Sequence, residues 1–173
     1  NRNDILVRFL DQGAMVAADV VATSSPSMDI GVSSNFERLL FEATSRDGGA
    51  CAATMAAFAA DGEYRVLPEV HGTITDYFDG VRVSEDEVDE EMAAWHRRGL
   101  MVEPHSAIGL RAAEARRVPG VPIVALATAH PAKFPDAVEA ATGVRPELPE
   151  ALADLLERPE HAYAVAADLA DVQ

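Results

Sequence analysis

Apolar residues recur at helical spacing in several short segments, most of them introduced by a capping residue or closed by a helix breaker. The segments with this pattern are residues 5–10, a stretch that starts at residue 36, and residues 52–60, 84–98, 104–117, 135–142 and 149–156. Two of these helices begin with a predicted capping box, Ser34 with Glu37 and Ser84 with Glu87. The chain is therefore predicted to be rich in helix.

Two segments predict buried strands instead. Residues 121–127 are continuously apolar and follow Pro119-Gly120, which is typical of a central parallel strand covered on both faces. Residues 100–102 form a shorter strand candidate. The pattern over residues 69–79 is ambiguous between a strand and a turn. Strands alternating with helices indicate an α/β fold, mostly helices around a few parallel strands. Because three candidates are few for so many helices, we expect another segment or subunit to supply more of the sheet.

The charge of the chain excludes some partners. The chain has 29 acidic and 14 basic residues, a formal net charge of −15, and shows no basic patch, so nucleic-acid binding is not expected. No apolar run reaches the roughly 18 residues of a membrane span, and no secretory signal is visible. The single cysteine, Cys51, fits a reducing compartment and predicts a cytoplasmic protein.

Two predicted strand-to-helix loops each carry a histidine and a hydroxyl residue. Residues 103–109 contain His105 and Ser106, and residues 128–134 contain His130 and Lys133, the only lysine of the chain. Ligands of open α/β sheets bind beyond the carboxyl ends of strands, so we expect both loops on one rim of the sheet. Ser106 could equally cap its helix, the histidines could be structural, and Lys133 could be a surface residue.

A third candidate site stands where the helix at residue 36 begins. Ser33, Ser34 and Asn35 offer hydroxyls and free amides, and Arg38 adds a guanidinium in the first turn, which together suit a phosphate or carboxylate. An ordinary helix cap with a surface arginine explains the same residues. The other histidines show no metal-ligand spacing, so no metal site is predicted.

Five segments, in order along the chain, resemble signatures of the threonine synthase family, most closely its longer bacterial and fungal type. They are NDIL (residues 3–6), SPSMDI (25–30), SSNFERLL (33–40), PHSAIG (104–109) and ATAHPAKF (127–134). The resemblance implies the fold of the tryptophan synthase β-subunit and a lyase of threonine biosynthesis that depends on pyridoxal phosphate (PLP). It also implies the conversion of O-phospho-L-homoserine and water to L-threonine and phosphate.

The resemblance assigns one cofactor contact. Ser106 matches the hydroxyl residue that bonds the pyridine nitrogen in this family, and such a neutral partner does not force that nitrogen to stay protonated. The Schiff-base lysine and the cofactor-phosphate loop of the family lie upstream of the matched region. Lys133 stands in the wrong motif to replace that lysine, so no catalytic residue is assigned. Ser33, Asn35, Arg38, His130 and Lys133 are candidates for substrate binding.

Residues 1–173 are therefore predicted to be one segment, the C-terminal part of a larger PLP-dependent unit. We expect it to need the N-terminal part as a partner and to be inactive alone. Two alternatives stay open: a non-catalytic remnant or interaction module of the same fold, and a serine or threonine dehydratase. The segments at residues 25–29 and 129–134 favour a synthase over a dehydratase.

Overall fold

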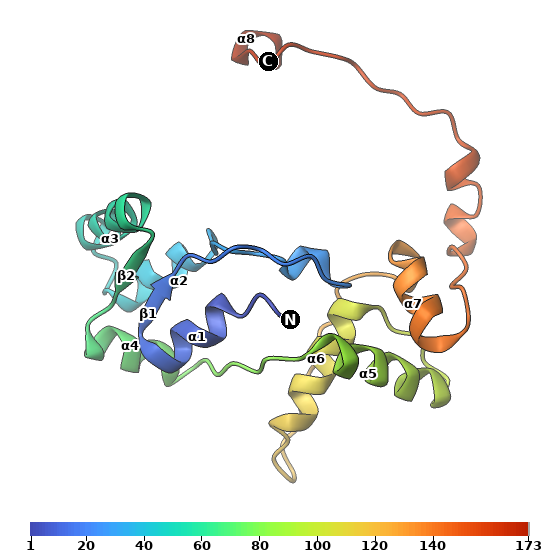
Figure 1. The fold of residues 1–173 in the computed structure, drawn as a ribbon, viewed down its shortest axis with the longest axis horizontal. Coiled ribbons are helices and arrows are strands. Elements are labelled where there is room, and N and C mark those ends of the chain that lie inside the picture. Colours follow the sequence, from blue (N-terminus) through green and yellow to red (C-terminus); the bar gives the residue numbers. More distant parts are fainter. Residues whose placement is uncertain (173) are drawn as a thin grey trace.

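A computed structural model describes residues 1–172, and Figure 1 shows its elements. The helices are α1 (Ile5–Gln12), α2 (Phe36–Ala43), α3 (Gly48–Asp61), α4 (Pro68–Thr75), α5 (Glu85–Arg97), α6 (Pro104–Ala115), α7 (Pro135–Thr142) and α8 (Leu169–Val172). The strands of this described part are β1 (Ala14–Val16) and β2 (Glu63–Arg65). Its 3-10 turns are η1 (Pro26–Met28), η2 (Pro131–Lys133), η3 (Glu150–Leu152) and η4 (Leu155–Glu157).

The first half of the chain packs around its own apolar core. Phe9 of α1 is fully buried and meets the Phe36 ring edge to face, with 4.6 Å between centroids. β1 and β2 pair antiparallel, with Met15 opposite Tyr64, and both side chains enter this core. The buried members of the core are Ile5, Phe9, Met15, Leu40, Cys51, Phe58, Tyr64 and Ile74.

The second core lies between α5, α6 and α7. Val88 and Met92 of α5 are fully buried, as is Val138 of α7. Their partners are Val83, Val102, Ala107 and Ile108, so this core begins directly behind the first turn of α6. It fixes the end of α6 on which the candidate site is built.

Several predicted elements are confirmed, and their signals are local. The capping box at α5 forms: Ser84 Oγ accepts from the Glu87 amide at 3.4 Å, and Glu87 Oε2 accepts from the Ser84 amide at 2.9 Å. α7 spans the predicted residues and ends at Gly143, whose φ of +75° suits glycine. The capping box predicted at Ser34 is wrong, because Asn35 caps α2 without a side-chain bond.

The parallel strands predicted from the sequence are not formed. Residues 100–102 and 121–127 have no regular secondary structure and no strand partner in the described chain, and residues 68–75 are the helix α4. Within residues 1–172 the sheet consists of the antiparallel pair β1–β2. A strand needs a hydrogen-bonded neighbour, and the described chain offers none beside these segments. The predicted helix over residues 149–156 is also wrong, since η3 and η4 occupy this region.

The chain beyond α7 leaves the packed body. In Figure 1 it runs away from α7 and ends at α8, far from both cores. Its apolar side chains are mostly open to solvent: Leu156 is 86% exposed and Tyr163 is 94% exposed. None of the described residues of this region belongs to either core.

Candidate functional site

A buried carboxylate closes the first turn of α6. Glu103 is the N-cap residue, and its side chain is 0% exposed. Its Oε1 accepts from the Ser106 backbone amide at 2.7 Å, and its Oε2 accepts from the His105 amide at 2.9 Å. Pro104 occupies the first helical position, where its missing N–H leaves one donor fewer to satisfy. Glu103 therefore accepts hydrogen bonds from the free amides at the positive end of the helix.

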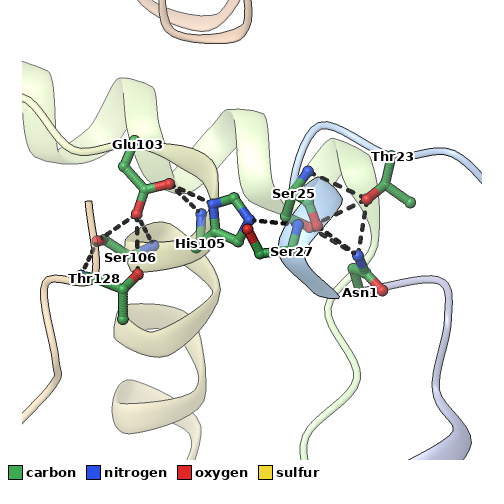
Figure 2. Close-up of polar contacts among 8 residues, drawn as sticks. All are labelled: Asn1, Thr23, Ser25, Ser27, Glu103, His105, Ser106 and Thr128. Carbon is green, nitrogen blue, oxygen red and sulfur yellow. Dashed lines mark hydrogen bonds and ion pairs between the residues drawn. The ribbon is translucent and has the colours of Figure 1, made fainter. Parts of the chain in front are cut away.

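Two side chains also donate to this carboxylate. The Ser106 hydroxyl donates to Oε1 and His105 Nδ1 donates to Oε2, each at 2.6 Å (Figure 2). Burial raises the pKa of Glu103, but the hydrogen bonds from Ser106 and His105 outweigh burial and hold that pKa below its ordinary value. Glu103 is thus ionised at neutral pH and offers acceptors only.

His105 connects α6 to the serine-rich segment of the first half. Its Nε2 accepts from the Ser27 amide at 3.1 Å, across 78 positions of sequence. Because this amide can only donate and the Glu103 carboxylate can only accept, the hydrogen bonds require a neutral His105 with its proton on Nδ1. The Phe134 ring packs against the imidazole, with 4.7 Å between centroids. His105 is thus held at both nitrogens and on its ring.

A hydrogen-bond network around Asn1 fixes the serine-rich segment. Asn1 Nδ2 lies 2.8 Å from each of three acceptors, Thr23 Oγ1, Ser25 Oγ and Asp29 Oδ1. The Thr23 hydroxyl also donates to Asp29 Oδ1 at 2.6 Å. Ser25 is fully buried and immediately precedes η1. The network therefore holds the turn whose Ser27 amide points at His105, as Figure 2 shows.

Thr128 brings the second predicted loop to the same place. Its backbone amide donates to Ser106 Oγ at 3.2 Å, and its hydroxyl donates to Glu103 Oε1 at 3.4 Å. These contacts confirm that the loops at residues 103–109 and 128–134 lie together, although no sheet aligns them. Ser106, which is 4% exposed, is the point where the loops join.

His130 and Lys133 lie further along the second loop. His130 Nδ1 accepts from the Ala132 amide at 3.2 Å and so caps η2. The Lys133 ammonium lies 5.5 Å from the centre of the Phe134 ring, whose other neighbour is His105. Both side chains are exposed and stand outside the Glu103 network. The structure therefore puts them near the predicted cofactor residue, but not in contact with it.

Ser33, Asn35 and Arg38 meet at the start of α2. The Arg38 guanidinium donates to Asn35 Oδ1 at 2.7 Å. All three residues line a groove of about 580 Å³, together with apolar side chains of α1 and residues 78–81. Figure 1 shows α2 and α7 on opposite sides of the molecule, and η2 adjoins α7. The structure therefore does not bring this group to Lys133.

Three members of the network were missed as site residues. Glu103 and Thr128 lie within the two predicted loops but carry no predicted role, and His105 could equally be structural. An acidic residue directly before a proline at a helix start was the available signal, since it marks a side-chain cap. The contact from Ser27 to His105 had no signal in the sequence.

The described residues contain neither a metal-binding cluster nor a membrane-spanning helix. Within residues 1–172 no group of three or more His, Cys, Asp or Glu side chains is placed to hold a metal ion. In the same part of the chain no helix combines the length and the apolar character needed to cross a membrane. Among the described residues, the candidate site is the Glu103 network, which consists of Glu103, His105, Ser106 and Thr128. It contains residues of both predicted loops.

Known proteins match this chain over its whole length. Residues 106–173 match the family model described as threonine synthase, C-terminal. A threonine synthase of Pseudomonas aeruginosa is 47% identical over 176 residues, which cover 100% of this chain and 38% of the relative. The chain belongs to the threonine synthase family. It spans about 38% of the length of this relative and of a second one from Methylobacillus glycogenes.

Solved threonine synthases share its fold. A PLP-bound threonine synthase from Brucella melitensis has a TM-score of 0.88 and 45% identity, covering 92% of this chain and 35% of that one. The yeast threonine synthase has a TM-score of 0.84 and 32% identity, covering 92% of this chain and 36% of that one. The resemblance read from the sequence is confirmed.

Proposed function

We propose that this chain supplies one part of the active site of a PLP-dependent threonine synthase. The reaction is the conversion of O-phospho-L-homoserine and water to L-threonine and phosphate. The observation that carries the proposal is the buried Ser106 hydroxyl, held between Glu103 and Thr128 at the start of α6. The similarity of 92% of this chain to a PLP-bound relative supports the cofactor.

The residues around Ser106 fit the ring-nitrogen end of PLP. A serine oxygen has one hydrogen and two lone pairs. The hydrogen goes to Glu103 and one lone pair accepts from the Thr128 amide, so one lone pair is left for a ligand. When bound, PLP would supply an electron sink for carbanion chemistry. Ser106 would hold and orient its ring nitrogen, and the Glu103 network would keep Ser106 in place.

Covalent attachment of the cofactor is not assigned to this chain. Lys133 is the only lysine of the sequence, and its exposed ammonium packs over Phe134, outside the network around Ser106. This chain covers 38% of the Pseudomonas aeruginosa relative, which is therefore about 2.6 times as long as the matched region. We infer that the attachment lysine lies in another part of the enzyme and that this chain alone is inactive.

An unpaired segment supports a larger unit. Residues 121–127 lack a strand partner, and Val124 and Leu126 are 83% and 73% exposed. The opposite face of this segment is only partly covered by α5 and α6. Exposed strand edges with apolar side chains favour pairing with another strand. We infer that residues 1–173 form one segment that pairs here with the N-terminal part of the enzyme.

Two groups of side chains are proposed for the substrate. Arg38, with Ser33 and Asn35, lines an open groove, and Lys133 with His130 stands near Ser106. Guanidinium and ammonium groups both suit a phosphate monoester. Because the two groups lie apart, we propose that Lys133 and His130 bind the substrate phosphate. Arg38 is the second candidate for this contact.

The alternatives carry less support. The relatives named above are threonine synthases, which favours a synthase over a dehydratase. A non-catalytic remnant would keep the Glu103 cap, yet it would not need the free lone pair of Ser106. We place the reaction in the cytoplasm, since Cys51 is a free, buried thiol.

Replacement of Ser106 in the full-length enzyme that contains this chain tests the proposal. We expect Ser106→Ala to lower kcat/KM for O-phosphohomoserine by about tenfold to a hundredfold, since a buried hydrogen bond of roughly 1–3 kcal/mol is lost. Ser106→Thr keeps the hydroxyl and should stay near the wild-type rate. Ser84→Ala is the matched control, because it removes a serine from another helix start. Equal kcat/KM values for Ser106→Ala and Ser84→Ala would contradict the proposal.

A further inference from the structure

Phe134 connects the buried network to the exposed end of the second loop. Its ring packs against the His105 imidazole, with 4.7 Å between ring centres, and the Lys133 ammonium lies 5.5 Å from the centre of the same ring. His105 is itself held at both nitrogens, by Glu103 and by the Ser27 amide. It therefore gives Phe134 a fixed surface to pack against, and Phe134 links α6 to Lys133.

The place of Phe134 in the chain gives its ring control over the whole turn. Phe134 ends η2 and is also the residue before the first turn of α7. Its amide donates to the Pro131 carbonyl at 3.0 Å, and its carbonyl accepts from the Val138 amide at 3.1 Å. A ring that is anchored on His105 at this junction fixes where η2, and with it Lys133, stands relative to α6.

An aromatic ring is a neighbour that leaves the ammonium available for an anion. It restricts the flexible lysine side chain without neutralising the charge, whereas a carboxylate in the same place would neutralise it and repel a phosphate. The two acidic residues of α7, Asp136 and Glu139, are paired with Arg145 instead, at 2.9 and 2.6 Å. The exposed Lys133 ammonium thus keeps its charge for a ligand that comes from solvent.

We propose that Phe134 is a positioning residue that holds the Lys133 ammonium in place for the phosphate of the substrate. This proposal rests on the proposed function, in which Lys133 contacts that phosphate. His130 does not depend on the ring in the same way, because its Nδ1 accepts from the Ala132 amide and is held within η2. Since the formal net charge of the chain is −15, the placement of a cation matters for binding an anion.

The test is calorimetric binding of inorganic phosphate, a product of the proposed reaction, to the full-length enzyme that contains this chain. We expect Lys133→Met to weaken binding by about tenfold or more, because a charged contact is lost. Phe134→Leu should weaken it by about threefold to tenfold, because the contact is kept but poorly placed. Phe134→Tyr keeps the aromatic face and should bind phosphate as the wild type does.

Steady-state kinetics give the same comparison with the substrate. In Phe134→Leu the KM for O-phosphohomoserine should rise by about threefold to tenfold, while kcat stays within about twofold of the wild type, as expected when binding is lost equally in ground and transition states. Phe134→Met, which also lacks an aromatic face, takes the place of Phe134→Leu if that variant does not fold.

A double mutant separates positioning from packing. If the ring acts through Lys133, Phe134→Leu should change phosphate affinity by less than about twofold once Lys133→Met is present. Phe58→Leu is the matched control. The Phe58 ring also packs on an aromatic residue, Tyr64, with 5.3 Å between centres, but it belongs to the first core. Its replacement should lower stability and leave phosphate affinity unchanged.

The outcomes distinguish the proposal from the proposed function. If Lys133→Met leaves both phosphate affinity and KM unchanged, the phosphate contact of the proposed function fails, and the role of Phe134 fails with it. If Lys133→Met weakens binding but Phe134→Leu does not, or if the two effects add in full in the double mutant, Phe134 is only a packing residue and the phosphate contact of Lys133 stands.

Discussion

The starts of α5 and α6 both pair a serine with a carboxylate, in reversed positions and in two different settings: Ser84 is the N-cap of α5, and Glu103 is the N-cap of α6. At α5 the carboxylate of Glu87 accepts from the amide and hydroxyl of Ser84, and at α6 the carboxylate of Glu103 accepts from the amide and hydroxyl of Ser106. The Glu87 side chain is 40% exposed and that of Glu103 is 0% exposed. If a carboxylate is removed, water can hydrogen-bond its former donors at α5, whereas water cannot reach those donors at α6.

The difference in burial changes what each carboxylate does. Hydrogen bonds from Ser84 hold the pKa of Glu87 below its ordinary value, and its further partner is the half-exposed Arg111. Glu103 instead joins three parts of the molecule: its own helix, the serine-rich segment through His105, and the loop of Thr128. One cap stabilises a helix end, and the other holds a site together.

The largest expected effect is the loss of the buried carboxylate. We expect Glu103→Ala to lower the free energy of unfolding by about 3–5 kcal/mol, because it leaves several buried donors without an acceptor. Glu87→Ala should cost much less, since water reaches the donors it leaves. Urea unfolding of both variants, measured beside the wild type, checks this. Equal losses would show that burial is not what separates the two caps.

A smaller effect should appear in the pH dependence of stability. The folded pKa of Glu103 is lowered, so its contribution is complete above the ordinary value of 4.5 and is lost as the pH falls through the folded pKa. The difference in unfolding free energy between wild type and Glu103→Gln should therefore be constant above about pH 5.5 and shrink below about pH 4.5.

Salt sharpens the same comparison. The difference in unfolding free energy between wild type and Glu87→Gln should become smaller with added salt, because that carboxylate is exposed. The Glu103→Gln difference should not. Urea unfolding across a pH series at two salt concentrations measures both quantities. A Glu103→Gln difference that stays constant to pH 3 would contradict the assignment of an ionised, hydrogen-bonded Glu103 at the start of α6.

The sequence predicted best where the physical signal is local. The capping box of Ser84 and the helix that ends at Gly143 were both predicted, since a few neighbouring residues determine them. The strand expected over residues 121–127 was wrong for this chain, because a strand is made by its neighbour and composition does not reveal whether that neighbour is present. The capping box at Ser34 failed because Asn35 takes the cap position.

The candidate site was predicted in part. The motif singled out Ser106, and the two loops were expected to meet at the rim of a sheet, whereas the hydrogen bonds of Thr128 join them here. The role of Glu103 was not predicted, because it depends on burial and on donors from three residues, His105, Ser106 and Thr128. The bond from Ser27 to His105 joins residues 78 positions apart, and no local pattern indicates such a contact. Long-range hydrogen bonds of this kind required the structure.

The most direct test of the central claim is a crystal structure of the full-length enzyme with PLP bound. We expect Ser106 Oγ within about 2.6–3.2 Å of the ring nitrogen, with its second short contact still on Glu103 Oε1. A ring nitrogen that bonds a different residue, with the Ser106 hydroxyl directed elsewhere, would contradict the account and leave Glu103 and Ser106 as parts of a buried helix cap.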